Sequence, residues 1–484
     1  MNNNHNTALF TDFYSLTMAQ GFWKMGMNKR SVFEMFFRSQ PFGGGFSIFA
    51  GLGTLLEKLK EFVFSSDDLQ YLKGLGIFED QFLEYLKDFR FKGSLWAFDE
   101  GTIIFPNEPI IRVDGGLIEC QIIEGLILNT INFQSLVATK AARVYIASGN
   151  KSVMEFGLRR AQGPDGALSA SRAAFIGGAS GTSNVLAAKI YDIPVFGTMA
   201  HSWVMAWPAE EDAFRAFADI YPDRSIFLID TYDTLKSGII NAIKVGKTLT
   251  SKGKNFGVRL DSGDIHYLST EVRKMLDEAG LNKATISVSN ELDESIIKTL
   301  TDAGAPVDVW GVGTRMVTGG SDAAFTGVYK LTARDDGSGN LTAAMKLSDN
   351  PDKTTNPGVK QVWRIKNTDN IFVADVLALE DPKEPDIMEK GKTYSFWHPS
   401  ADYRRFYHTL EGSAEPLLTV KIRDGKPEGK NVPIKEIQER FKMELESLDS
   451  SHKRILNPHI YKVSVTERLR ALKLKLIKNY LGEL

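Results

Sequence analysis

Short apolar runs recur along the middle of the chain, and each is followed by a stretch in which apolar residues return with helical spacing. The runs are KSVMEFG, DIPVFGTMAH, RSIFLIDTYD, NFGVRLDSGD, ATISVSN and VDVWGVGT. The four central runs begin near residues 192, 225, 255 and 284, so they are 33, 30 and 29 residues apart, about one βα unit each. This spacing predicts a parallel β/α array, and five or six such units favour a barrel or an incomplete barrel over a small open sheet.

The two ends of the chain follow other patterns. Before the array, EMFFRSQPFGGGFSIFAGL predicts a strand, a glycine-rich turn and a second strand or helix start, and GSLWAFDEGTIIFPNEPIIRVDG predicts a β-meander with proline-marked turns. After about residue 350 the spacing breaks down, and the last 50 residues return to an amphipathic helical pattern. We therefore expect an N-terminal α+β domain over 1–140, an α/β barrel over 141–350, and a C-terminal extension over 351–484 that packs on the N-terminal domain.

The composition is that of ordinary soluble domains, with 43% hydrophobic and 24% charged residues. A balance of 58 basic against 60 acidic residues favours neither nucleic acid nor an anionic membrane as a partner. The single cysteine, Cys120, excludes an internal disulfide framework, and we expect it to be a buried small hydrophobe. The N-terminal stretch has no basic region followed by an apolar core, and no apolar run approaches the roughly 18 residues that span a bilayer. These features predict a cytoplasmic protein.

Polar side chains gather where the predicted strands end, which is the edge at which parallel α/β folds build their sites. RLDSGD places Arg259, Asp261 and Asp264 on a turn after FGV. An arginine can hold a planar carboxylate bidentately, and a carboxylate pair can hold a hydroxylated sugar or Mg²⁺. Alternatively, Asp264 only caps the next helix. Because capping leaves Arg259 and Asp261 unexplained, we favour a binding role.

Two further loops suit an anionic ligand. WGVGTRMVTGG directly follows VDV, and glycine-rich loops of this kind point backbone N–H groups at a phosphate, although a plain turn is the alternative. EFGLRRAQGPDGALSASR supplies three arginines next to Phe156. Charge clusters on turns are usually solvated surface. An aromatic ring beside two guanidinium groups is also a suitable seat for a flat anionic ring.

His201 lies in GTMAHSWV, where an apolar run ends. Taken alone, it is best interpreted as a hydrogen-bonded core histidine, and a general base or a covalent acceptor are the alternatives. Asp230, at the end of the run SIFLID, could orient the imidazole. TDFYSLTMAQ, taken alone, predicts only an N-cap followed by an amphipathic helix.

Six motifs, in order, resemble those of the nicotinate phosphoribosyltransferases: TDFYSLTMAQ, EFGLRRAQGPDGALSASRAAFIGG, GTMAHSWV, LIDTYDT, RLDSGD and GVGT. The likeness runs from about residue 8 to the C-terminal tail. It implies the irregular α/β barrel of the type II phosphoribosyltransferases, with an N-terminal layer, in a head-to-tail homodimer with shared sites. It also implies that nicotinate and phosphoribosyl pyrophosphate, with Mg²⁺, give nicotinate mononucleotide and pyrophosphate, and that ATP hydrolysis drives the equilibrium in NAD biosynthesis.

The same resemblance implies a role for each site residue. The residues implied at the nicotinate end are Phe156 and the partner subunit's Tyr14, which sandwich the ring, and Arg159, Thr198 and Arg259, which hold the carboxylate. The residues implied at the phosphoribosyl end are Asp261 for the ribose hydroxyls and the Mg²⁺–pyrophosphate, Gly311, Gly313 and Thr314 for the 5′-phosphate, and Ser289 and Asn290 beside them. His201 matches the histidine that ATP phosphorylates.

Rival interpretations remain. A nicotinamide-using phosphoribosyltransferase has an acidic residue where this chain has Ser183, and an acidic group would repel a carboxylate. A barrel aldolase, isomerase or decarboxylase would need a lysine or a general-base carboxylate at a strand end. Glu155 is the one residue of these types there, and in a regular strand it alternates away from the site. A non-catalytic ligand sensor would not need to keep the phosphoacceptor His201.

Overall fold

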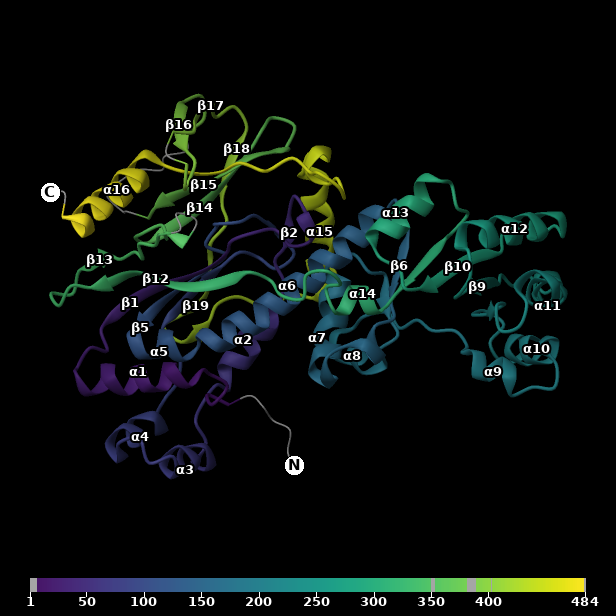
Figure 1. Ribbon diagram of the computed structural model, residues 1–484, viewed down its shortest axis with the longest axis horizontal. Helices are drawn as coiled ribbons and strands as arrows, with labels where there is room; N and C mark the ends of the chain where they lie inside the picture. Colours follow the sequence, from purple (N-terminus) through teal and green to yellow (C-terminus); the bar gives the residue numbers. More distant parts are fainter. Residues whose placement is uncertain (1–6, 350–352, 381–388, 402, 483–484) are drawn as a thin grey trace. The chain divides into compact units, whose positions relative to one another are not determined.

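The computed structural model describes residues 7–349, 353–380, 389–401 and 403–482 of the chain. Residues 1–6 lie outside the described residues. They belong to the N-terminal stretch in which we found no basic region followed by an apolar core. The chain divides into two compact units: residues 1–136 with 324–484 form the first, and residues 137–323 form the second. Both units mix helices and strands, so the predicted α/β class is confirmed (Figure 1).

The second unit is built on a six-stranded parallel sheet with the strand order β7-β6-β11-β10-β9-β8. The bounds of its strands are β6 Ser152–Glu155, β7 Gly181–Thr182, β8 Ile226–Leu228, β9 Gly257–Leu260, β10 Thr285–Asn290 and β11 Val309–Val312. Five of these strands were predicted from the apolar runs. The last strand, β11, pairs with the first, β6, so the sheet is curled rather than laid out in chain order.

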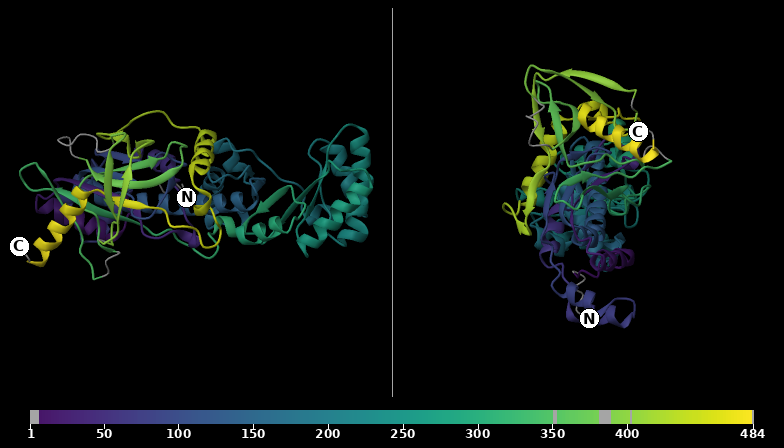
Figure 2. Two further views of the ribbon diagram at one scale, coloured as in Figure 1. Left: turned by 90° about the horizontal axis from the view of Figure 1, so that it is seen from above. Right: turned by 90° about the vertical axis from the view of Figure 1, so that its left-hand side faces the viewer.

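Helices follow the strands of this unit, as the alternating pattern predicts. Their bounds are α7 Gly163–Ile176, α8 Val185–Tyr191, α9 His201–Met205, α10 Glu210–Ile220, α11 Ile239–Ser251, α12 Ile265–Glu278, α13 Glu294–Asp302 and α14 Thr314–Val317. Asp264 caps α12 by accepting the Tyr267 N–H at 3.0 Å, so the capping role considered for Asp264 is confirmed. Figure 2 shows helices of this unit, in teal, stacked side by side at one end of it.

The strand predicted from the run DIPVFGTMAH, residues 192–201, is wrong, because the structure describes all of these residues and has no strand there. Its residues form only an isolated parallel bridge, between Thr182 and Val195. Phe196 N–H donates to the Thr182 carbonyl at 2.9 Å, and Thr182 N–H donates to the Pro194 carbonyl at 3.0 Å. Pro194 has no N–H with which to extend the ladder on the N-terminal side of the bridge. On the other side, the Asn184 N–H donates to Thr182 Oγ1 instead of to the neighbouring segment. The strand that the sequence did not reveal, β7, lies on the other side of this bridge.

The first unit carries a seven-stranded sheet to which both ends of the chain contribute. Its strands, in spatial order, are β13 Leu341–Ala343, β12 Gly327–Asp335, β1 Arg30–Phe37, β5 Ile111–Gly116, β3 Ser94–Ala97, β19 Thr419–Arg423 and β20 Lys426–Pro427. Strand β12 pairs antiparallel with β1, and β19 pairs antiparallel with β3. The boundary expected at residue 350 therefore differs from the structure, in which β12 belongs to the first unit.

A second six-stranded sheet of this unit comes from the C-terminal part of the chain. Its strands, in spatial order, are β17 Arg405–Thr409, β16 Thr393–Trp397, β21 Val463–Val465, β15 Phe372–Leu379, β14 Lys360–Lys366 and β18 Ser413–Pro416. The remaining elements are β2 Ser47–Ile48, β4 Ile103–Ile104, α1 Phe13–Lys24, α2 Leu52–Lys60, α3 Ser66–Gly74, α4 Asp80–Lys87, α5 Leu117–Ile122, α15 Ile434–Ser447 and α16 Glu467–Leu481, and α6 Glu124–Ala147, which runs on into the second unit. Helix α16 packs on β15 and β16.

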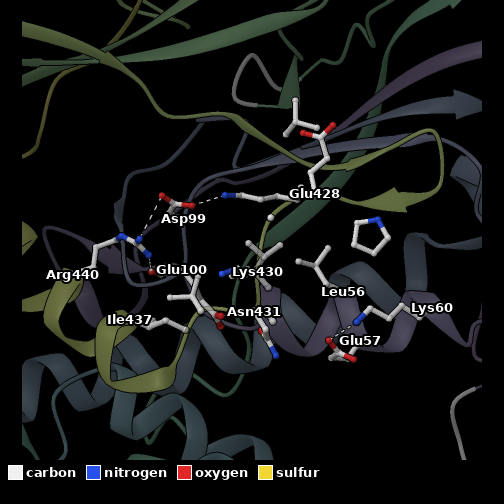
Figure 3. Close-up of a pocket in the computed structure, with 17 residues that line it drawn as sticks. Leu56, Glu57, Lys60, Asp99, Glu100, Glu428, Lys430, Asn431, Ile437 and Arg440 are labelled. Atoms are coloured by element: carbon white, nitrogen blue, oxygen red, sulfur yellow. Dashed lines mark hydrogen bonds and ion pairs between the residues drawn. The ribbon is translucent and has the colours of Figure 1, made fainter.

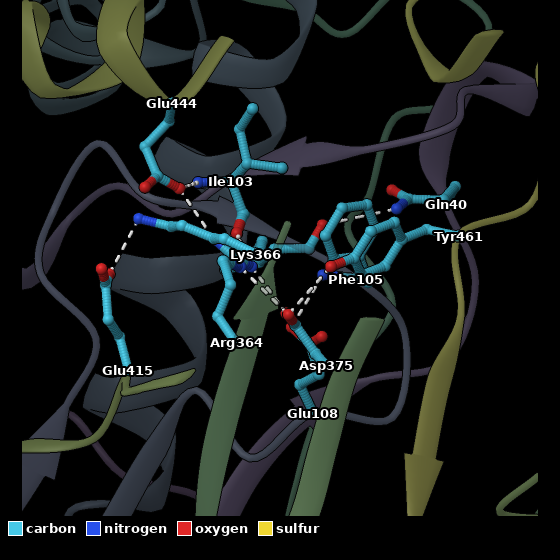
Figure 4. Close-up of polar contacts among 11 residues, drawn as sticks. Gln40, Ile103, Phe105, Glu108, Arg364, Lys366, Asp375, Glu415, Glu444 and Tyr461 are labelled. Atoms are coloured by element: carbon cyan, nitrogen blue, oxygen red, sulfur yellow. Dashed lines mark hydrogen bonds and ion pairs between the residues drawn. The ribbon is translucent and has the colours of Figure 1, made fainter. Parts of the chain in front are cut away.

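A buried cluster of charges joins these elements (Figure 4). The Arg364 guanidinium, which is fully buried, donates to Asp375 at 2.6 and 3.0 Å and to Glu444 at 2.7 Å. It also donates to the Ile103 carbonyl at 2.8 Å, so β14, β15, β4 and α15 meet at one side chain. Burial raises the pKa of the nearby Glu108 carboxyl well above its ordinary value, and the Asp375 charge raises it further.

Two expectations about apolar residues have different outcomes. Cys120 is fully buried, as predicted, and burial raises the pKa of its thiol. We expected no stretch apolar enough to span a bilayer, and this expectation is too strong. Residues 117–147 form one helical stretch that is long and apolar enough to cross a membrane, judged by length and composition alone. Of its most apolar window, 72% is buried, as in the core helix of a folded protein, and one such helix is weak evidence for a membrane span.

Candidate functional site

A cavity of about 470 Å³ opens where the strands of the parallel sheet end. Its walls come from the ends of β6, β9, β10 and β11 with the segments that follow them, from Ser183 after β7 and from residues 197–200, all within the second unit. Among the residues predicted for the site, those that line it are Phe156, Arg159, Ser183, Thr198, Arg259, Asp261, Ser289, Asn290, Gly311, Gly313 and Thr314. Segments that are more than 150 residues apart in sequence thus meet at one edge of the sheet.

Arg259 lies on β9 and keeps unused hydrogen-bonding capacity. Its Nη1 donates to Thr198 Oγ1, and its Nε is buried without a hydrogen-bond partner in the part of the chain that the structure describes. Burial lowers the pKa of the guanidinium, and Asp261 and Asp230 act in the opposite direction. Because an arginine stays charged even after such a shift, Arg259 brings a cation to the cavity wall and keeps one buried nitrogen without a partner.

Asp261 follows β9 directly and meets two other predicted residues. Its Oδ1 accepts a hydrogen bond from Ser289 Oγ, and its Oδ2 lies 3.8 Å from His201 Nε2. The side chain remains 36% exposed, so the carboxylate is held by neighbours and is still open to a ligand. Such an acceptor suits sugar hydroxyls, or a cation that arrives with a substrate.

His201 begins helix α9, and its imidazole has a different neighbour from the one predicted. Its Nδ1 lies 3.1 Å from Thr231 Oγ1. Asp230 Oδ2 instead accepts the Asp261 N–H at 2.9 Å and the Ser262 hydroxyl at 2.6 Å. The assignment of Asp230 as the group that orients His201 is therefore corrected: Asp230 holds the turn that carries Asp261, and Thr231 contacts the imidazole.

The glycine loop after β11 is shaped by the aromatic wall. A Cβ added to Gly311 would lie 2.7 Å from the Phe156 ring, and one added to Gly313 would lie 3.1 Å from the Phe156 carbonyl. Glycine at both positions lets this loop approach the strand end that carries Phe156. Thr314 Oγ1 donates to Glu291 Oε1 at 3.2 Å.

Asn290, at the end of β10, has a backbone φ of 138°, which is unfavourable for a residue with a side chain. The preceding Ser289 is the residue that donates to Asp261. Strained backbone of this kind gathers at functional sites, because the surrounding structure must hold it in place. The conformation of Asn290 is therefore a further sign that this edge of the sheet binds a ligand.

Tyr14, the predicted residue from outside this unit, lies on α1 of the first unit. Its side chain is half-exposed, and so are those of Phe10, Phe13 and Met18 nearby in sequence. Burial of part of the ring raises the pKa of its hydroxyl, and the charges of Glu124 and Asp12 raise it further. The phenol is therefore neutral at physiological pH.

Several residues of the cavity wall were not predicted. They are Leu158, Gly197, Met199, Ala200 and Glu291, whereas Arg160 was among the arginines expected next to Phe156. Most of them are next to a predicted residue in sequence, so their position at a strand end was a signal that could have found them. No group of three or more His, Cys, Asp or Glu side chains able to hold a metal ion occurs among the described residues.

A second cavity, of about 390 Å³, lies in the first unit between α2, the β19–β20 hairpin and α15 (Figure 3). Several of its charged groups satisfy one another: Lys421 donates to Asp99, and Arg440 donates to the Glu100 carbonyl at 2.8 Å. Burial would raise the pKa of Asp99, but Lys421 and Arg440 hold it below the ordinary value. This cavity contains no residue of the six motifs, so the cavity of the second unit is the candidate active site.

A parallel β/α sheet whose carboxyl edge carries arginines, an aspartate and a glycine loop is typical of an α/β protein with a site suited to an anionic ligand. Models of the nicotinate phosphoribosyltransferase (NAPRTase) family match the chain over residues 9–132 (N-terminal domain), 151–366 (the family model) and 359–473 (C-terminal domain). The nicotinate phosphoribosyltransferase of Bacillus subtilis (strain 168) is 42% identical over 463 residues, which cover 95% of this chain and 93% of that protein. The chain belongs to the nicotinate phosphoribosyltransferase family.

Solved structures agree with this assignment. The crystal structure of human nicotinic acid phosphoribosyltransferase matches with a TM-score of 0.84 at 31% identity, over 96% of this chain and 99% of that chain. Nicotinate-nucleotide pyrophosphorylase from Pyrococcus furiosus matches with a TM-score of 0.69 at 23% identity, over 92% and 97% of the two chains. The second match shows a shared fold.

Proposed function

We propose that this protein transfers the phosphoribosyl group of phosphoribosyl pyrophosphate to nicotinate, forming nicotinate mononucleotide and pyrophosphate for NAD biosynthesis. The observation that carries this proposal is the cavity of the second unit, in which Phe156, Arg259 and Asp261 face one space at the edge of the parallel sheet. The membership of the chain in the nicotinate phosphoribosyltransferase family supports the same reaction. We also propose that the enzyme works in the cytoplasm.

Nicotinate is a flat ring with a carboxylate, and one side of the cavity suits both parts. Phe156 offers an aromatic face, and the buried Nε of Arg259 is a donor that still lacks a partner. Arg159 and Thr198 line the same space, and Thr198 already orients the Arg259 guanidinium. Bidentate pairing of a guanidinium with a carboxylate is strong and directional, so Arg259 selects the acid.

The phosphoribosyl group fits the other side of the cavity. Asp261 can accept hydrogen bonds from the ribose hydroxyls, and Gly311, Gly313 and Thr314 form the loop for the 5′-phosphate, with Ser289 and Asn290 beside it. Mg²⁺ suits a site with one or two protein carboxylates, because substrate phosphates and water supply its other ligands. Asp261 is such a carboxylate, and Mg²⁺ bound there would neutralise the charge of the leaving pyrophosphate.

The reaction needs positioning more than proton transfer. As pyrophosphate leaves, positive charge develops on the sugar carbon, and the pyridine nitrogen must already point at it. The aromatic wall and Arg259 hold the ring, while Asp261 and the glycine loop hold the sugar, so the two reactants approach in a fixed orientation. No side chain has to act as a strong base, in keeping with the residue types of the cavity wall.

His201 is proposed to accept a phosphoryl group from ATP. Because Nδ1 faces Thr231, Nε2 is the nitrogen turned toward Asp261, 3.8 Å away. A phosphate on this ring would add negative charge beside the pyrophosphate subsite, which can bias binding between the substrate and product states. This would couple ATP hydrolysis to nucleotide formation.

Two architectural proposals accompany this function. The parallel sheet is an irregular, incomplete barrel, because β11 closes onto β6 while β7 and β8 remain as its edges. The enzyme is a homodimer in which the partner subunit's Tyr14 completes the ring site. The exposed aromatic and methionine side chains of α1 support such an interface, because large apolar groups rarely stay together in water.

The proposal is tested by incubating the protein with phosphoribosyl pyrophosphate and Mg²⁺ and measuring pyrophosphate release with nicotinate or nicotinamide, each with and without ATP. We expect release with nicotinate, stimulated by ATP, and none when Asp261→Ala replaces the wild type. Release that depends on nicotinamide instead would favour the amide-using alternative. Nicotinate binding without release in any mixture would favour the ligand sensor.

A further inference from the structure

Glu155 is a fully buried carboxyl group next in sequence to Phe156 of the candidate site, and the reaction proposed above makes no use of it. It is the last residue of β6, immediately before Phe156. No ion pair to Glu155 occurs in the described part of the chain, so hydrogen bonds alone must stabilise its side chain. Keeping an acidic group in such a place is unfavourable unless those bonds are complete.

Three donors from three segments satisfy this carboxylate. The Gly157 N–H donates to Oε1 from the loop after β6, while Ser171 Oγ donates to Oε2 at 2.9 Å from α7. Thr182 Oγ1 donates to Oε2 at 2.5 Å from β7. Ser171 and Thr182 are themselves buried, so the network is shielded from water.

The network extends to the residues that line the cavity. The Ser183 N–H donates to the Glu155 main-chain carbonyl at 3.0 Å. Asn184 N–H donates to Thr182 Oγ1 at 2.9 Å, and Asn184 Nδ2 lies 3.3 Å from Ser171 Oγ. Ser183 therefore lies between Thr182, which bonds to the Glu155 carboxylate, and Asn184, which bonds to two partners of that carboxylate.

Gly157 shows how closely the loop fits this arrangement. A Cβ at this position would lie 2.2 Å from a methyl carbon of Val317 and 2.9 Å from Glu155 Oε1. Both distances are too short for a real side chain, so only glycine lets the loop place its N–H on the carboxylate. The Arg160 N–H in turn donates to the Gly157 carbonyl at 2.8 Å, which ties the arginine turn to the same anchor.

We propose that Glu155 is a positioning residue: its buried carboxylate joins the loop after β6, helix α7 and strand β7, and thereby fixes the Phe156, Arg159 and Ser183 walls of the nicotinate subsite. The inference rests on the proposed function in that the cavity must bind nicotinate. A shift of about 1 Å in such walls can lower a rate by about 100-fold, because the ring must be aimed at the reacting carbon. Loss of the anchor should therefore weaken nicotinate binding more than phosphoribosyl pyrophosphate binding.

The test compares Glu155→Ala with Leu276→Ala, a control that opens a cavity in the fully buried face of α12. Two quantities are measured: the KM for each substrate, and the amide exchange rates of peptides covering residues 155–160 and 181–184. For Glu155→Ala we expect a rise of about 10-fold or more in the KM for nicotinate, less than about twofold for phosphoribosyl pyrophosphate, and faster exchange in both peptides. Leu276→Ala should lower the melting temperature and leave both KM values and both exchange rates as in the wild type.

Glu155→Gln is the conservative variant. If Glu155→Ala does not fold, the same KM values and exchange rates are measured on Glu155→Gln instead. Its oxygen still accepts the Gly157 N–H, and its amide donates to the two hydroxyls, so the KM for nicotinate should rise by less than about threefold. Equal changes in both KM values, or unchanged exchange in Glu155→Ala, would overturn the positioning role. If the wild type makes no nucleotide from nicotinate, the proposed function is overturned, and so is the part of this inference that names nicotinate as the ligand. The exchange rates would still decide whether Glu155 fixes the cavity walls.

Discussion

Two arginines on strands of the two units show how differently each unit uses charge. Arg364 of the first unit is fully buried and is bound by Asp375, Glu444 and a backbone carbonyl (Figure 4). Arg259 of the second unit binds Thr198 through one nitrogen and keeps another buried nitrogen without a partner. A guanidinium in which every nitrogen has a protein partner stabilises the fold, whereas one that keeps a nitrogen without a partner has capacity left for a ligand.

The largest expected effect is on stability, from Arg364→Ala. This change leaves Asp375 and Glu444 buried without their cation, and breaking such a buried pair costs about 3–5 kcal/mol of unfolding free energy. Chemical denaturation of the variant and the wild type measures the difference. Arg423→Ala, which breaks the exposed pair with Glu428, is the control and should leave the stability unchanged. A small loss for Arg364→Ala would mean that its cluster does not hold the first unit together.

Arg259→Ala should instead affect activity and leave stability nearly unchanged. Loss of a charge-assisted contact to the nicotinate carboxylate should lower kcat/KM for nicotinate by about 100-fold, mostly through KM. Any activity with nicotinamide should fall much less, because an amide carries no charge for the guanidinium to bind. Steady-state kinetics with both acceptors, and with Arg259→Lys as the charge-preserving control, check this. Equal losses for both acceptors would remove Arg259 from carboxylate recognition.

His201→Ala should separate nucleotide formation from ATP use. Because the imidazole faces Asp261 and Thr231 and is not part of the cavity wall, transfer should persist while the stimulation by ATP is lost. Rates with and without ATP, together with a phosphoryl-transfer assay using γ-labelled ATP, measure this. His266→Ala, on helix α12, is the matched control and should keep both signals. Unchanged stimulation in His201→Ala would exclude the coupling role.

The smallest expected effect is the pH dependence contributed by Glu108. Burial and the neighbouring Asp375 raise the pKa of this carboxyl well above its ordinary value of 4.5. Above that ordinary value the unfolded chain releases the proton while the folded chain retains it, so stability falls as pH rises toward the raised pKa. Glu108→Gln cannot ionise, so its melting temperature relative to the wild type should increase by a few degrees between pH 5 and pH 8. A difference that is independent of pH would contradict the protonated state.

The sequence reveals the second unit better than the first, for a physical reason. Each βα unit is local, so apolar runs and turn residues mark the strand ends that bring Arg259, Asp261 and Gly311 together. The sheet of the first unit pairs Ser31 with Arg334, and no local pattern encodes such a partner. The same limit applies to side chains: Asp230 and Thr231 are adjacent at a strand end, and only the structure tells which of them faces His201.

The sequence analysis missed the effects of two residues, Pro194 and Glu155. Pro194 breaks the strand expected before His201, although proline is a known signal for missing ladder bonds. Glu155 was set aside because a regular strand turns it away from the cavity, and the structure agrees that it is buried. Its bonds to α7 and β7 depend on how three successive segments pack on one another, so their contribution to the site could not be predicted from spacing alone.

Our central claim is that Arg259 of the second unit selects nicotinate for phosphoribosyl transfer. The most direct test is a competition: equal concentrations of nicotinate and nicotinamide with phosphoribosyl pyrophosphate, Mg²⁺ and ATP, followed by mass-spectrometric identification of the nucleotide formed. We predict nicotinate mononucleotide almost alone. Nicotinamide mononucleotide as the main product, or no nucleotide at all, would contradict the claim.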